Sequence, residues 1–150
     1  MSQDHWERIY RTKNPTSLAL ARQRLGARAA LVTWLAADVR AVPLSADGYA
    51  VWHDRAVFHF LTDATDRARY VAHLRQTLKV GGSAIIATFA LDGPEECSGL
   101  PVARYSPETL ASELGPQFRL MTWLPHVHTT PWGAAQSFQY SRFQRTTSPA

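Results

Sequence analysis

The chain contains a single cysteine and no long apolar run. Cys97 is alone among the 150 residues, which excludes an intrachain disulfide and fits a reducing compartment. No apolar stretch approaches the roughly 20 residues that a membrane-spanning helix needs. Residues 1–6 also lack the basic and apolar regions of a signal peptide. These absences predict a cytoplasmic protein that has no membrane partner.

Basic residues are not gathered into runs, although the formal net charge is +4. The arginines are spread over predicted helices and loops, which favours a solvated surface over a nucleic-acid partner. With 45% hydrophobic and 19% charged residues, the composition is that of a globular protein. We predict one domain over residues 1–150, with an N-terminal entry segment at 1–16 and a flexible tail at 144–150.

Hydrophobic patterning predicts strands that alternate with helices. Leu78 precedes Lys79–Gly82, which stops a helix that Thr62 or Asp63 caps, and a buried strand follows. Together with the preceding strand, this makes a parallel βαβ unit. The other expected elements are a helix over Ser17–Gly26, strands at Leu31–Leu35, Tyr49–Trp52 and Ser83–Phe89, a helix from Ser106 to Gly115, and strands at Phe118–Leu124 and Ala135–Phe143.

Polar residues follow two of the predicted strands. His53, Asp54 and Arg55 end the strand at Tyr49, and Asp38 follows the strand at Leu31. In an open α/β sheet, ligands bind at the carboxyl ends of the strands. These residues are therefore candidates for ligand binding. The alternative is that they satisfy backbone groups at a strand end or in a turn.

The loop from Leu91 to Tyr105 is long enough to form a pocket wall. At its end, Arg104 and Tyr105 are placed to orient a small anionic substrate. A surface arginine and a core tyrosine are the alternative for this pair. Cys97, within the loop, lies beside two acids that raise the pKa of its thiol, so we expect a bystander or a wall of a substrate pocket and not a nucleophile.

Three histidines remain candidates for the substrate side. His59 lies between two phenylalanines, which favours packing against a helix or against the pocket. His126 and His128 are two residues apart, so both side chains point to one face of an extended segment. That spacing is compatible with a transition metal if His59 and Cys97 come close, but two histidines are a weak signal and we predict no metal site.

Three segments together resemble the class I S-adenosylmethionine (SAM)-dependent methyltransferases, of the bacterial small-molecule type. They are Trp34–Val39, Trp52–Leu61, and Leu78–Gly82 followed by an apolar strand, and residues 5–15 resemble the entry segment of that group. The resemblance covers roughly residues 17–143. It implies an α/β fold with a truncated Rossmann-like methyltransferase sheet, mostly parallel, with an antiparallel C-terminal strand.

The resemblance also implies a cofactor, a substrate and roles for individual residues. SAM would be held by Asp38 and Val39 on its adenine side and by His53 near its methionine end. His53, Asp54 and Arg55 would be the catalytic residues, acting by orientation and proton removal. The partner would be a small molecule that contacts the substrate-side residues, which are His59, Cys97, Arg104, Tyr105 and His128.

The chain lacks the glycine-rich turn that such a site requires. None of its eight glycines lies in a strand-to-helix turn of GxG type. By resemblance, the first strand, the glycine-rich loop, the next helix and the second strand are missing between Thr16 and Ser17. Half of the polar atoms of the cofactor would then lack a partner.

Loss of these strands would also leave open sheet edges. We expect the sheet to close by re-pairing its strands or by forming a homodimer, with domain swapping as one route. The predicted function is SAM-dependent methylation of a small molecule with an incomplete cofactor site. The alternative is an inactive, shortened methyltransferase-like domain that serves as an interaction or scaffold protein, or a deletion product.

Overall fold

The computed structural model describes residues 18–147, in two compact units, Met1–Asp38 and Val39–Ala150. The predicted entry segment at 1–16 lies outside the described residues. Within residues 18–147, no helix has the length and hydropathy needed to cross a membrane.

The first unit is helical over residues 18–31, and the predicted strand at Leu31–Leu35 is wrong. Residues 18–25 form an α-helix, as expected, and the 3₁₀-helix η1 follows at Gly26–Leu31. Leu31 is 86% exposed, and the Trp34 indole N–H donates back to the carbonyl of Ala29 at 3.2 Å. A short apolar run does not by itself specify a strand, because the extended backbone also needs a neighbouring strand to bond.

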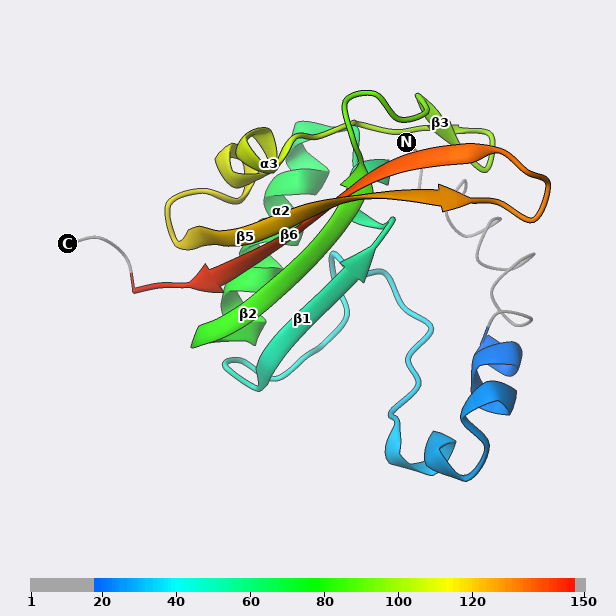
Figure 1. Cartoon of the computed structure of the whole chain (residues 1–150). Helices are drawn as coiled ribbons and strands as arrows, with labels where there is room; N and C mark the ends of the chain where they lie inside the picture. The colour runs from blue at the N-terminus through cyan, green and yellow to red at the C-terminus, as the bar shows by residue number, and fades with distance from the viewer. Residues whose placement is uncertain (1–17, 148–150) are drawn as a thin grey trace. The chain divides into compact units, whose positions relative to one another are not determined.

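The second unit contains a four-stranded sheet in the order β1-β2-β6-β5 (Figure 1). β1 and β2 are parallel, whereas β6 is antiparallel to both of its neighbours. The predicted α/β sheet with an antiparallel C-terminal strand is therefore confirmed, but the sheet is not mostly parallel, because two of the three strand pairings are antiparallel. Only one parallel pair is present among the described strands, because residues 31–35 form no strand. The strands are β1 (Tyr49–Arg55), β2 (Leu78–Phe89), β5 (Phe118–Thr129) and β6 (Ala135–Arg145).

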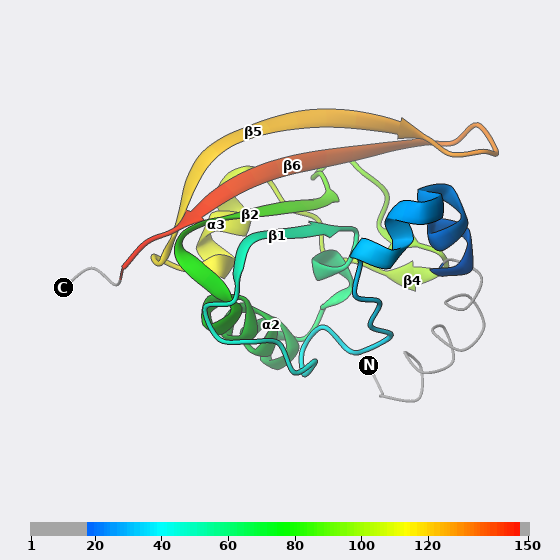
Figure 2. The same cartoon turned by 90° about the horizontal axis from the view of Figure 1, so that it is seen from below.

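Two capped helices cover one face of this sheet (Figure 2). α2 (Ala64–Thr77) begins after Asp63, whose carboxylate accepts hydrogen bonds from two backbone N–H groups of the first turn. α3 (Pro107–Leu114) begins with a capping box between Ser106 and Thr109. Both helices start where the predicted cap residues place them.

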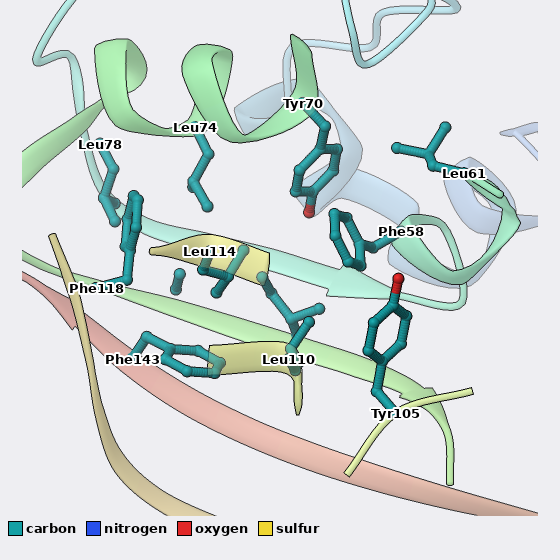
Figure 3. Packing of buried hydrophobic residues seen from close by; sticks show 12 residues of the cluster. Phe58, Leu61, Tyr70, Leu74, Leu78, Tyr105, Leu110, Leu114, Phe118 and Phe143 are labelled. Carbon is teal, nitrogen blue, oxygen red and sulfur yellow. The ribbon is translucent and has the colours of Figure 1, made fainter. Parts of the chain in front are cut away.

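The core lies between these helices and the sheet (Figure 3). Phe58, in the 3₁₀-helix η2 (Phe58–Phe60), packs between two tyrosines. Its ring centroid lies 4.8 Å from that of Tyr70 and 5.5 Å from that of Tyr105. Leu74, Leu110 and Phe143, from α2, α3 and β6, are each 0% exposed. The turn after β1 is thus packed into the core.

The loop predicted at Leu91–Tyr105 contains a short hairpin, β3 (Glu96–Cys97) and β4 (Leu100–Pro101). Two backbone hydrogen bonds tie the end of the loop to the β1–β2 edge. Ala103 N–H donates to the carbonyl of His59 at 2.8 Å, and Tyr105 N–H donates to the carbonyl of Phe89 at 3.0 Å. The loop is therefore fixed beside the carboxyl ends of β1 and β2.

The predicted start of the tail at residue 144 is wrong. β6 continues to Arg145, whose guanidinium pairs with the carboxylate of Asp47 at 2.7 Å. The next residue, Thr146, donates its N–H to the carbonyl of Gln117 at 2.8 Å. These partners lie far away in the sequence, so a local pattern does not reveal them. Residues 148–150 lie outside the described part.

Candidate functional site

β1 places the predicted catalytic residues on opposite faces of the sheet. Side chains alternate along a strand, so Trp52 and Asp54 point toward the helices while His53 and Arg55 point away. Asp54 is 5% exposed, whereas His53 and Arg55 are exposed. The three residues are adjacent in sequence, but they do not form one group in space.

Asp54 is buried and fully hydrogen-bonded. Its two oxygens accept from the N–H groups of Val57 and Phe58 at 3.0 and 3.1 Å, and from the Tyr70 hydroxyl at 2.6 Å. The Trp52 indole N–H in turn donates to the Tyr70 oxygen at 2.9 Å. This arrangement favours the alternative role, in which Asp54 satisfies donors at the strand end.

Burial also shifts the pKa values of this network. Desolvation raises the pKa of Asp54, against the opposing effect of its hydrogen bonds from Tyr70 and the turn. The pKa of Tyr70 lies well above 10, because its hydroxyl is buried and then because it faces the Asp54 carboxylate. At neutral pH the tyrosine keeps its proton and remains a donor to Asp54.

On the other face, Arg55 lies against two aromatic side chains of β6. Its Nε donates to the Tyr140 hydroxyl at 2.9 Å, and its Cζ lies 4.6 Å from the centroid of the Phe138 ring. Phe138 also packs edge-on against Phe89, with ring centroids 4.8 Å apart. We call Arg55, Phe89, Phe138 and Tyr140, together with His59, the Arg55 cluster.

His59 extends this cluster under the loop that follows β2. Its side chain is 0% exposed, and its ring centroid lies 4.8 Å from that of Phe89. Nδ1 accepts the N–H of Phe89 at 3.1 Å, so the neutral ring carries its proton on Nε2. Nε2 is buried and has no hydrogen-bond partner within residues 18–147. Burial, and then the charge of Arg55, lowers the pKa of His59 to about 4.

Two further predicted substrate residues lie beside the Arg55 cluster. Cys97, in β3, is half-buried and packs against the buried group of Ala87, Phe89 and Phe138. The His128 ring lies 6.4 Å from that of Phe138, and the His126 ring lies 6.0 Å from that of Tyr140. Both histidines therefore face the same side of the sheet. Among residues 18–147, no three His, Cys, Asp or Glu side chains are grouped closely enough to hold a metal ion.

The remaining predicted site residues lie elsewhere. Tyr105 is 5% exposed in the core under the helices, where burial raises its pKa to about 12. Arg104 pairs with Glu95 at 3.3 Å and fastens the loop. Asp38 is exposed in the first unit, whereas Val39 is half-buried in the second and offers its carbonyl to His73. Their roles in binding stay predictions.

Sequence reasoning missed the aromatic members of the cluster. Phe138 and Tyr140 lie two residues apart on β6, and the register pairs them with Phe89 and Ala87 of β2. The alternation of the two aromatic residues indicates that they share a face. The sequence does not reveal that Arg55 lies against that face.

Among residues 39–147, neither connection from a strand to a helix contains a glycine. The one strand-to-helix crossover of the second unit runs from β1 to α2, and the side chain of Asp63 already occupies the first N–H groups of that helix. Gly81 and Gly82 lie inside β2 and not in a turn before a helix. The glycine-rich turn that the sequence lacks is therefore also absent from the described part of this unit.

The buried histidine predicts a dependence of stability on pH. The folded pKa of His59, about 4, lies below its ordinary value of 6.5, so its contribution is present above pH 6.5 and is lost as the pH falls toward 4. We expect this group to remove about 3 kcal/mol of unfolding free energy over that interval. Urea unfolding at several pH values measures the slope of the unfolding free energy against pH.

In the His59→Gln variant, Oε1 can still accept the Phe89 N–H, and this part of the slope should disappear. A matched Arg75→Gln variant replaces an exposed residue of α2 that keeps its charge throughout this pH range, and it should keep the wild-type slope. Equal slopes for wild type and His59→Gln would contradict the assignment of a neutral, buried imidazole.

Comparison with known proteins identifies the fold. No family model matches the sequence, and neither does any curated protein compared with it. Among solved structures, the 1,6-didemethyltoxoflavin-N1-methyltransferase of Burkholderia thailandensis, bound to 1,6-didemethyltoxoflavin and S-adenosylhomocysteine, has a TM-score of 0.63 and 18% identity over 87% of this chain and 56% of its own. The N-methyltransferase NodS of Bradyrhizobium japonicum WM9, in complex with S-adenosylhomocysteine, has a TM-score of 0.62 and 14% identity, and the match covers 89% of this chain and 63% of that chain.

A SAM-dependent methyltransferase of Methanosarcina mazei has a TM-score of 0.58 and 9% identity, with coverages of 75% of this chain and 66% of that chain. The present chain thus spans between 56% and 66% of the length of these three structures. At sequence identities this low, the similarity shows a common fold and nothing more. The chain has the fold of the class I SAM-dependent methyltransferases. Its described strands form part of the sheet of that fold.

Proposed function

We propose that this chain acts in the SAM-dependent methylation of a small molecule, and that it supplies the side of the site that holds the methyl acceptor. The single observation that supports this function is the Arg55 cluster. It places an exposed cation and the half-buried Tyr140 over buried aromatic rings at the carboxyl ends of β1 and β2. In α/β sheets this is the edge where ligands bind.

Within that site, the side chains of this chain bind and orient. The exposed Arg55 guanidinium attracts an anionic or electron-rich acceptor, and the buried rings of Phe89 and Phe138 pack beneath it and support its position. His59 is 0% exposed, and it holds the backbone of Phe89 in place through its Nδ1. Cys97 and the loop around it cover the aromatic rings and limit access of water. SAM supplies the methyl group, and most of its polar contacts must come from outside the described residues.

A homodimer is the proposed assembly, because β1 lies at the edge of the described sheet. Tyr49 and Val51 on this strand are 42% and 58% exposed. An edge strand with exposed apolar side chains is a template for pairing with another strand. A second copy of the chain would cover this edge, with or without domain swapping. The single Cys97 favours a reducing location such as the cytoplasm.

The same edge supports a second candidate function, an interaction or scaffold role without catalysis. The observation that favours it is the incomplete cofactor site together with the exposed β1 strand. In this case the polar residues at the strand ends would serve folding, as Asp54 does.

Titration with S-adenosylhomocysteine distinguishes the two functions. Each polar group left without a partner costs about 1–3 kcal/mol, so we expect a dissociation constant in roughly the high micromolar to millimolar range. In amide NMR spectra, saturable shifts should centre on Arg55, Ala56, Phe89 and Ala90. Arg55→Gln should reduce them, and Arg75→Gln, on the far end of α2, should not.

The absence of saturable shifts at these positions would overturn the methyltransferase proposal and leave the interaction role. Low-micromolar binding by the isolated chain would contradict the incomplete site, because another surface would then replace the missing loop.

Light scattering with size-exclusion chromatography tests whether the chain dimerises through the β1 edge. We expect a dimer for the wild-type chain and a monomer for Val51→Lys, because a lysine on an edge strand opposes pairing. Val127→Lys is the matched control, since Val127 is 62% exposed on β5 at the opposite edge, and it should remain dimeric. A wild-type monomer would contradict the homodimer.

A further inference from the structure

A surface pocket lies between α2 and the segment that precedes β1. Its volume is about 390 Å³, within the range of pockets that hold small organic ligands. One wall is a stripe on α2 that includes Arg69, His73 and Gln76, which are spaced three and four residues apart along one face of the helix. The opposite wall is the segment 40–44.

Positive charge dominates this pocket. Its lining includes Arg40 and Arg69 and no acidic residue. Arg40 is engaged, because its Nη1 lies 2.7 Å from a carboxylate oxygen of Asp66. Within residues 18–147, Arg69 has no ion pair, so its charge is uncompensated at the pocket. A guanidinium in this situation is a ready partner for a carboxylate or a phosphate.

The rest of the lining is apolar or fixed in position. Val42, Pro43 and Leu44 give the segment an apolar surface. The His73 Nδ1 lies 2.7 Å from the carbonyl of Val39, so Nδ1 donates and the ring orientation is fixed. The pocket thus pairs a cationic end with an apolar wall.

We propose that this pocket binds a small organic anion, a carboxylate or a phosphate monoester with an apolar body, through Arg69. The site is distinct from the Arg55 cluster. His73 packs against Trp52, with ring centroids 6.0 Å apart, and Trp52 lies on the face of β1 opposite Arg55. Binding here depends neither on SAM nor on methyl transfer.

The test is an amide NMR titration of the full chain with phenyl phosphate, benzoate and inorganic phosphate. We expect saturable shifts at Arg69, Ala72, His73 and Gln76 with phenyl phosphate or benzoate. Whichever of these two probes binds more tightly shows whether the pocket prefers a phosphate or a carboxylate. Inorganic phosphate should bind at least about tenfold more weakly, because it lacks the apolar body.

Arg69→Gln should weaken binding of the organic anion by about tenfold or more. Arg69 is exposed, so this variant should keep the wild-type thermal midpoint. Arg75→Gln is the matched control, since Arg75 lies on the same helix outside the pocket, and it should bind like wild type. The proposal is overturned if no probe gives saturable shifts up to about 5 mM, or if both variants weaken binding equally. Shifts confined to the Arg55 cluster would also overturn it.

Discussion

The buried carboxylate of Asp54 is the interaction on which the rest of the second unit depends. It closes the turn after β1 through two backbone N–H groups and binds α2 through the Tyr70 hydroxyl. One side chain therefore sets where β1 ends, how η2 turns and where α2 packs. Any substitution that removes its oxygens leaves three donors without an acceptor in the core.

The position of Asp54 also determines the candidate site. Because β1 turns Asp54 inward, the next residue, Arg55, must point to the opposite face. There it meets the aromatic rings that β6 contributes through its register with β2. The fold network and the proposed acceptor site are thus two faces of the same strand end. This division explains how polar residues at one strand end can serve both the fold and the proposed site.

Local patterns predicted the elements that local interactions stabilise. The caps of α2 and α3 depend on residues within one turn, so Asp63 and Ser106 were sufficient to place both helices. Leu31–Leu35 failed because a strand depends on a partner that the sequence pattern does not supply. Gln139 is polar, yet it is 3% exposed, because its amide donates to the Thr88 hydroxyl at 2.9 Å across the sheet.

Local patterns likewise predicted only some of the residues that the structure brings together at the candidate site. Arg55, His59, Cys97 and His128 are gathered near Phe89 and Phe138, as their place at strand ends and loops indicated. Asp54 and Tyr105 turned inward because alternation along the chain and core packing decide direction, not proximity in sequence. The aromatic partners of Arg55 come from a strand 85 residues away, as its bond to Tyr140 shows, and only the register of the sheet brings them together.

The most direct measurement compares the free energies of unfolding of Asp54→Ala and Arg55→Ala in urea. If Asp54 holds the fold together and Arg55 faces a ligand, Asp54→Ala should lose about 3 kcal/mol or more of unfolding free energy. The reason is that three donors in the core lose their acceptor. Arg55→Ala should lose about 1 kcal/mol or less, because its side chain is exposed. Equal losses, or a larger loss for Arg55→Ala, would contradict this division of roles between the two faces of β1.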